Sequence, residues 1–278
     1  MIQLFNEVSQ KCSKLTTQKY STSFASAIKL LHTDLRGPIY NIYGFVRFAD
    51  EIVDTFHDFD KKALLAEFKK ETYDALERGI SLNPILNSFQ LTVNQYNIDL
   101  KLVEAFFKSM EQDLTKSQYT ASEFNEYIYG SAEVVGLMCL VIFCDGDYSK
   151  YDQLKIYAKS LGAAFQKVNF LRDLKADFQG LERIYFPNCD FVNFTTENKR
   201  CIEEDIQKDF NLAYEGIIKL PLNAKFGVYV AYKYYLSLFK KIKKVQPQKI
   251  MDQRIRIPNY GKAMILAKAG LRSQFNIL

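Results

Sequence analysis

Residues 166–177 read QKVNFLRDLKAD and place two aspartates four positions apart in a stretch that is otherwise largely apolar. An α-helix turns about 100° per residue, so four of its polar side chains fall within a sector of roughly 80°: Gln166, Asn169, Asp173 and Asp177. Leucine, valine and phenylalanine cover most of the remaining circumference. The stretch predicts a mostly buried helix with a polar stripe too narrow for an ordinary solvated face.

Residues 43–54, YGFVRFADEIVD, repeat this pattern. Tyr43, Arg47, Asp50 and Asp54 are spaced by four, three and four positions, which gathers them within roughly 60° of a helix. The side chains around them are mostly isoleucine, valine, phenylalanine and alanine. The sequence therefore predicts two largely buried helices that each carry an aspartate pair.

The two stripes together predict one binding site. Charged side chains are almost never buried unless they are paired or bind a metal ion, so we expect the stripes to face each other across a water-filled cleft. Four carboxylates in one cleft need cations, and oxygen ligands suit Mg²⁺, which shares its coordination shell with substrate phosphates. We therefore expect a Mg²⁺ site that binds a diphosphate.

The composition predicts an all-α protein of one domain over residues 1–278. Only 12 Gly and 6 Pro interrupt 278 residues, and no change in composition or low-complexity linker divides the chain. Asp34 to Pro38 are expected to break the chain, and residues 180–197 to form a loop. The periodicity predicts helices at about 3–16, 39–57, 60–79, 85–97, 100–111, 121–144, 151–178, 198–219, 222–245 and 258–274.

Several function classes are disfavoured. Five cysteines without CxxC spacing and only two histidines predict free thiols in a reducing cytoplasm and no zinc site. The N-terminus lacks signal-peptide features, and the longest apolar run, Val134 to Phe143, is too short to span a membrane. The net charge of +5 is too diffuse for nucleic acid. The basic run 240–249, KKIKKVQPQK, is either solvated or touches an anionic membrane at its inner face.

Three smaller features add to the site. Hydroxyls in YSTSF, residues 20–24, either cap a helix or contact phosphate at its positive end. Gly130, Ala132 and Gly136 leave room for a close helix crossing or a ligand. Arg183 and Tyr185 follow the second aspartate pair and are placed to close over a bound anion.

Five blocks, in this order and at these separations, resemble the squalene and phytoene synthase family of head-to-head prenyl transferases. The blocks are YSTSF at 20–24, YGFVRFADEIVD at 43–54, YIYGSAEVVGLM at 127–138, LGAAFQKVNFLRDLKADFQGLERIYFP at 161–187 and RIRIP at 254–258.

The resemblance implies an isoprenoid synthase fold, one helical bundle around a central cavity. It implies that Mg²⁺ is bound by Asp50, Asp54, Asn169, Asp173 and Asp177. It implies contacts to the substrate diphosphate from Ser21, Ser23, Arg47, Gln166, Arg172, Tyr185, Tyr235 and either Arg254 or Arg256. The implied catalytic residues are Tyr43, Arg47, Tyr127 and the four aspartates.

The implied activity is that of a prenyltransferase. The block at 127–138 and the compact length favour a phytoene synthase, which joins two geranylgeranyl diphosphates through a cyclopropyl diphosphate. The alternatives are a squalene or dehydrosqualene synthase that uses two farnesyl diphosphates, NADPH being required only for squalene, and a non-catalytic relative that acts as a binding module. No obligate protein partner is implied. Glu133 replaces a glycine of many members and would narrow the cavity if it pointed inward.

Overall fold

The computed structural model describes residues 1–180, 183–187, 194–252 and 254–274, except the side chains of 176–180, 251, 252, 259, 273 and 274. These residues form helices and no β-strand. The elements are α1 (Ile2–Tyr20), α2 (Thr22–Ile28), α3 (Thr33–Asp54), α4 (Lys61–Arg78), α5 (Pro84–Tyr96), α6 (Leu100–Asp113), α7 (Ala121–Ile128), the π-helical turn η1 (Tyr129–Glu133), α8 (Val134–Phe143), α9 (Tyr148–Gly180), α10 (Thr196–Ile217), α11 (Leu222–Lys243), α12 (Pro247–Asp252) and α13 (Asn259–Gln274).

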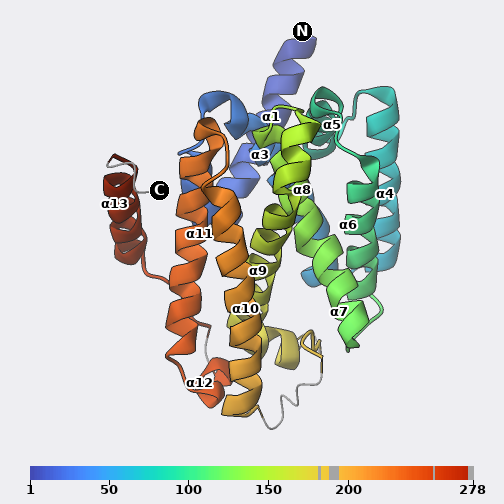
Figure 1. The fold of residues 1–278 in the computed structure, drawn as a ribbon. Helices are drawn as coiled ribbons and strands as arrows, with labels where there is room; N and C mark the ends of the chain where they lie inside the picture. The colour runs from blue at the N-terminus through green and yellow to red at the C-terminus, as the bar shows by residue number, and fades with distance from the viewer. Residues whose placement is uncertain (181–182, 188–193, 253, 275–278) are drawn as a thin grey trace.

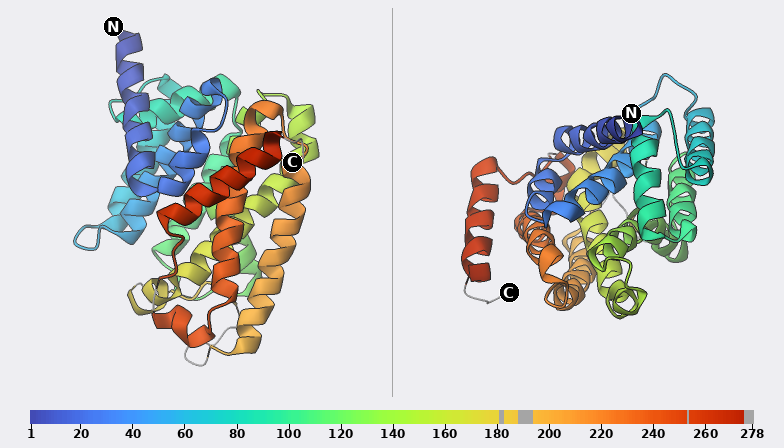
Figure 2. Two further views of the ribbon diagram at one scale, coloured as in Figure 1. Left: turned by 90° about the vertical axis from the view of Figure 1, so that its left-hand side faces the viewer. Right: turned by 90° about the horizontal axis from the view of Figure 1, so that it is seen from above.

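The long helices stand side by side as a bundle (Figure 1), and α9 occupies its middle. It contacts α8, α10, α11 and α12, while α3 packs against α1, α5 and α8. The two aspartate helices therefore belong to the same bundle. The N-terminal half of α1 projects beyond the bundle, and α13 lies outside it, against α11 (Figure 2).

The first aspartate helix is longer than the sequence indicates, and the expected break from Asp34 to Pro38 is wrong. Helix α3 begins at Thr33 and contains Pro38 in its second turn. A proline there removes the hydrogen bond to the carbonyl four residues earlier, and its ring crowds that carbonyl. Leu35 and Ile39, on either side of it, are buried, so their packing outweighs the lost bond.

The predicted helix 121–144 is divided by the π-helical turn η1. The turn packs closely against α6 on one side and α9 on the other. A Cβ on Gly130 would lie 2.5 Å from the carbonyl oxygen of Ala105, and one on Gly162 would lie 2.6 Å from that of Ala132. The prediction that small residues here permit close helix approach is confirmed.

Ala121–Phe143 is the one described stretch whose length and hydropathy would suffice to span a membrane. Of its apolar window, 56% is buried inside the bundle, where α8 contacts α3, α6 and α9. Packing within the protein therefore accounts for much of its apolar character.

Candidate active site

A cavity of about 580 Å³ lies between α2, α3, α8, α9, α10 and α11. Along α3, the lining residues run from Ile39 to Asp54, with the apolar side chains first and the aspartates last. Along α9, the order is the same from Leu154 to Asp173. A rise of 1.5 Å per residue makes these two walls about 22 and 28 Å long. The cavity is therefore a long apolar chamber with a charged end.

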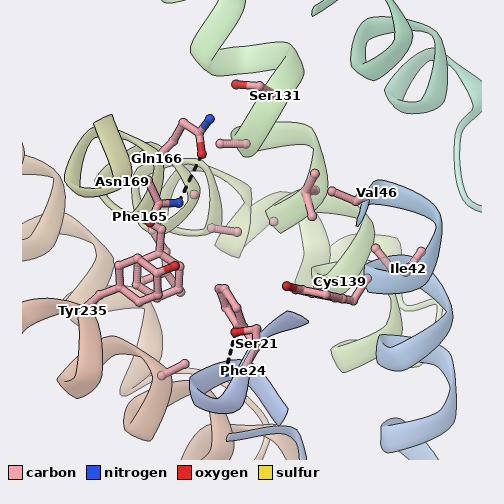
Figure 3. A pocket seen from close by; sticks show the side chains of 18 of the residues that line it. Ser21, Phe24, Ile42, Val46, Ser131, Cys139, Phe165, Gln166, Asn169 and Tyr235 are labelled. Atoms are coloured by element: carbon pink, nitrogen blue, oxygen red, sulfur yellow. Dashed lines mark hydrogen bonds between the residues drawn. The ribbon is translucent and has the colours of Figure 1, made fainter. Parts of the chain in front are cut away.

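Aromatic rings surround the middle of this chamber (Figure 3). Phe165 and Tyr235 stack with ring centroids 3.9 Å apart, and the ring of Phe24 lies 5.6 Å from that of Tyr235. Tyr43 lies 5.7 Å from Phe24, between ring centroids. Burial raises the pKa of Tyr43 to about 12, so its hydroxyl remains protonated. All four rings line the cavity, and aromatic rings of this kind attract positive charge.

The first aspartate pair lies at the charged end. Asp50 lies 4.0 Å from Nη1 of Arg47, which also pairs with Glu51. Asp54 lies 2.8 Å from Nη1 of Arg183. Burial, and then the neighbouring Asp54 carboxylate, raise the pKa of Asp50 to about 7. Two carboxylates one helical turn apart thus repel each other in the free protein.

Asp173, from the second pair, also lines the cavity. Its carboxylate pairs with the adjacent Arg172 and, at 2.7 Å, with Nε of Arg254. Of the two arginines between which the sequence did not decide, Arg254 lines the cavity and Arg256 does not. The side chain of Asp177 lies outside the described residues.

The donor atoms at the charged end suit Mg²⁺. Among the described side chains, no three Asp, Glu, His or Cys residues are close enough together to hold a metal ion. The donor chemistry nevertheless fits, because the Oδ1 atom of Asn169 is buried with no hydrogen-bond partner and Asp50 is crowded by Asp54. An orphaned amide oxygen and two repelling carboxylates that line the same cavity are groups that an oxygen-binding cation satisfies.

Of the other predicted contacts, Gln166 lines the cavity and its Oε1 accepts a 3.5 Å hydrogen bond from Asn169. Ser21 also lines it, and its hydroxyl caps α2 by accepting from the backbone N–H of Phe24 at 3.2 Å. Ser23 is not among the lining residues, nor is Glu133, whose carboxylate lies 3.0 Å from Lys159. The serine cap is therefore present, and Glu133 does not narrow the cavity.

Asp113, which the sequence pattern did not single out, lies at the centre of a buried network. Its side chain is 4% exposed and accepts hydrogen bonds from the hydroxyls of Tyr127, at 2.8 Å, and Tyr185, at 3.1 Å. Arg183 lies 3.6 Å from the same carboxylate and also pairs with Asp54. Burial raises the pKa of Asp113 to about 7, against the effect of Arg183.

A sequence signal for Asp113 exists. It follows Phe106 by seven positions and Met110 by three, and so lies on the apolar face of its helix. Both of those residues are buried. A carboxylate on such a face needs partners, and Arg183 and the two tyrosines supply them.

The comparisons with known proteins agree with this geometry. The family model described as squalene/phytoene synthase matches residues 17–261. A phytoene synthase of Arthrospira platensis is 27% identical, covering 95% of this chain and 92% of that protein. The chloroplastic phytoene synthase 3 of Zea mays is 26% identical over 92% of this chain, which spans only 64% of its length.

Solved structures show the same fold. A dehydrosqualene synthase in complex with ligand superposes with a TM-score of 0.80 at 19% identity, covering 97% of this chain and 98% of that one. The squalene synthase HpnC of Alicyclobacillus acidocaldarius gives a TM-score of 0.73 at 20% identity, covering 86% and 94%.

The family match, the similar phytoene synthase and the shared fold together identify a helical prenyltransferase, an enzyme that transfers alkyl groups. The chain belongs to the squalene and phytoene synthase family. The predictions of an all-α chain and of the isoprenoid synthase fold are confirmed.

Proposed function

We propose that this protein is a phytoene synthase, which joins two molecules of geranylgeranyl diphosphate head to head. The observation that carries the proposal is the order of side chains along the cavity, since a chamber that is apolar along its length and charged at one end matches prenyl diphosphates. The phytoene synthases that resemble nearly the whole chain support the choice of substrate.

The charged end of the cavity would bind the diphosphate groups. Arg47, Arg172 and Arg254 already lie beside carboxylates there and would exchange part of these contacts for diphosphate oxygens. Asp50, Asp54, Asn169, Asp173 and Asp177 would hold Mg²⁺. Bound Mg²⁺ would supply Lewis-acid stabilisation of the departing diphosphate.

The aromatic middle of the cavity protects the reacting carbons. Loss of diphosphate leaves an allylic cation, which the rings of Phe24, Phe165 and Tyr235 stabilise and keep from water. The double bond of the second substrate attacks this cation, and loss of a proton closes the cyclopropyl diphosphate. A second ionisation, rearrangement and proton loss give the C40 hydrocarbon.

The second candidate is a dehydrosqualene or squalene synthase acting on two farnesyl diphosphates. The similar solved structures carry these names, and their likeness concerns the fold. A squalene synthase would also consume NADPH to reduce the final cation. The cavity chemistry is common to all three reactions.

Product analysis tests the proposal. Purified protein and Mg²⁺ are incubated with farnesyl or geranylgeranyl diphosphate, with and without NADPH, and the extracted hydrocarbon is identified by mass. We expect a C40 product from geranylgeranyl diphosphate without NADPH. A C30 product alone would assign the second candidate. If folded protein gave no hydrocarbon from either substrate, the result would favour a non-catalytic relative that acts as a binding module.

A further inference from the structure

The outer face of α13 carries apolar side chains that nothing in the described structure covers. Tyr260, Met264 and Leu271 are 73%, 55% and 57% exposed, and Ala267 between them is exposed too. Their spacing gathers them within roughly 60° of the helix. We call these four residues the α13 stripe.

The opposite side of α13 is apolar as well. Ala269 is buried, and Ile265 and Leu266 pack against the core. A helix that is apolar on both sides is normally covered on both. The helix stands outside the bundle on the flank of α11 (Figure 2), so its stripe is open to a large partner.

Charge identifies the kind of partner. After Asp252 the chain contains no Asp or Glu and five basic residues, Arg254, Arg256, Lys262, Lys268 and Arg272. The remaining 32 basic residues equal the 32 acidic residues of the chain. The net charge of +5 therefore resides wholly in this C-terminal segment.

The basic residues of α13 have no carboxylate partner in the described part of the chain. Lys262 donates to the hydroxyl of Thr22 at 2.6 Å, and Arg272 to that of Tyr229 at 3.4 Å. Lys268 is exposed and lies on the flank of the stripe, about 80° from Tyr260 around the helix.

We propose that α13 docks the protein on the surface of an anionic lipid bilayer. The stripe enters the boundary between headgroups and acyl chains, and Lys268 on its flank faces lipid phosphates. A second copy fits this face less well, because two α13 helices would bring six basic residues together without an acidic one.

The basic run 240–249 is less suited to docking, because it lacks an exposed apolar face. Its apolar neighbours Phe239 and Ile242 are buried, and Lys241 donates to the backbone carbonyl of Arg256 at 2.7 Å. The run offers charge without an exposed apolar face, so we assign docking to α13.

The position of α13 gives docking a consequence. The helix reaches α2 through Thr22 and α11 through Tyr229, and both of those helices line the cavity. A docked protein would hold this wall of the cavity beside the bilayer, the phase into which lipidic substrates and hydrocarbon products partition. Docking itself does not depend on the proposed reaction.

Sedimentation with sucrose-loaded vesicles tests the proposal. The full-length protein is mixed with vesicles of pure phosphatidylcholine or with 30% phosphatidylglycerol, at low and high salt. The stripe is probed by the double variant Met264→Glu/Leu271→Glu. Its matched control, Ile80→Glu/Leu82→Glu, alters exposed apolar residues at the α4–α5 connection. Lys268→Glu is paired with Lys240→Glu in the basic run.

We expect salt-sensitive binding to the anionic vesicles alone. The stripe variant and Lys268→Glu should each weaken it about tenfold or more, since each basic residue near an anionic surface contributes a several-fold gain in affinity. Both controls should bind like the wild type, and circular dichroism should show all variants folded.

Three results would overturn the proposal. The wild type fails to bind anionic vesicles, the stripe variant binds as well as the wild type, or the controls lose binding equally. A wild-type dimer that the stripe variant converts to a monomer, without vesicle binding, would assign the face to a second copy. Sedimentation measures binding and not turnover, so none of these results tests the proposed reaction.

Discussion

The Nη1 atom of Arg183 lies 2.8 Å from Oδ1 of Asp54, which joins residues 129 positions apart in the sequence. The same guanidinium lies 3.6 Å from the buried carboxylate of Asp113, and Arg183 also donates to the backbone carbonyl of Val53 at 3.2 Å. One cation thus fixes the end of α3 to the chain that follows α9, and it balances two carboxylates that both line the cavity.

Replacing this arginine should destabilise the protein in a pH-dependent way. Arg183→Met leaves Asp113 buried without a cation, and we expect a loss of about 3 kcal/mol in the free energy of unfolding at pH 9. The loss should be smaller at pH 6, where Asp113 takes up a proton. Urea unfolding at both pH values measures this. Arg78→Met, which removes an exposed pair with Asp74, should cost under about 0.5 kcal/mol. Equal losses at pH 6 and pH 9 would contradict the account.

The pH dependence of wild-type stability should carry the signature of Asp113. Its pKa is about 7 in the folded protein and 3.8 in the unfolded chain, so the folded state binds the proton more tightly. The contribution of Asp113 to the free energy of unfolding is therefore full below about pH 4, and it is lost as the pH rises from about 4 through 7. Asp50 contributes in the same direction.

Asp113→Asn should therefore flatten this curve in metal-free buffer, measured by urea unfolding from pH 4.5 to 8. The variant should also lose about 1–3 kcal/mol near pH 5, because an amide satisfies fewer of the surrounding donors. An unchanged slope would show that Asp113 titrates normally.

Asp50→Asn should separate catalysis from folding. We expect turnover to fall at least about 100-fold, since the charged end loses a carboxylate needed beside the leaving group. Stability at pH 8 should hold or rise, because the repulsion with Asp54 is relieved. Steady-state kinetics and thermal unfolding provide the two readouts. Asp74→Asn, on the exposed face of α4, is the control and should retain full activity.

Metal binding can be followed without turnover. Mg²⁺ with inorganic pyrophosphate should raise the melting temperature of the wild type by a few degrees, and EDTA should reverse the shift. Asp50→Asn and Asn169→Leu should lose most of it, whereas Asp74→Asn should keep it. A full shift in Asn169→Leu would exclude the orphaned amide oxygen as a ligand.

The crossing of η1 with α9 should tolerate no added methyl group. A Cβ at Gly162 would lie 2.6 Å from the carbonyl oxygen of Ala132, so Gly162→Ala should cost about 1–3 kcal/mol. A Cβ added to Gly37, inside α3, would meet nothing within 4 Å. Gly37→Ala should therefore be neutral or stabilise by up to about 1 kcal/mol. Chemical denaturation of both variants makes the comparison, and similar losses in the two would contradict it.

Much of the fold could be predicted because apolar periodicity directly reflects which face of a helix is buried. The helix bounds near Gly79, Pro84 and Gly180 follow local turn chemistry and agree with the structure. The start of α3 was predicted wrongly from local turn chemistry, because burial of Leu35 and Ile39 overrides the local effect of Pro38. The π turn and the short helix α12 were not predicted. Apolar periodicity does not reveal the single extra residue of a π turn, and a helix of six residues is too short to show a period.

The candidate site was predicted as far as each helix carries its own signal. The stripes with Asp50, Asp54 and Asp173 do line one cavity, because i, i+4 spacing fixes their direction. Their counter-charges could not be assigned in the same way. The partners Arg183 and Arg254 come from distant segments, and spacing within one helix says nothing of contacts between segments.

The π turn at Tyr129–Glu133 acts as a one-residue spacer in the chain. Its hydrogen bonds close over five residues instead of four, so it holds one residue more than an α turn. Deleting a residue there would restore regular winding and rotate all of Val134–Phe143 by about 100° against α7. Gly136 would leave its crossing with Ala158, and a different face of the helix would form the cavity wall. The shape of the chamber thus depends on the number of residues in this turn as well as on their identity.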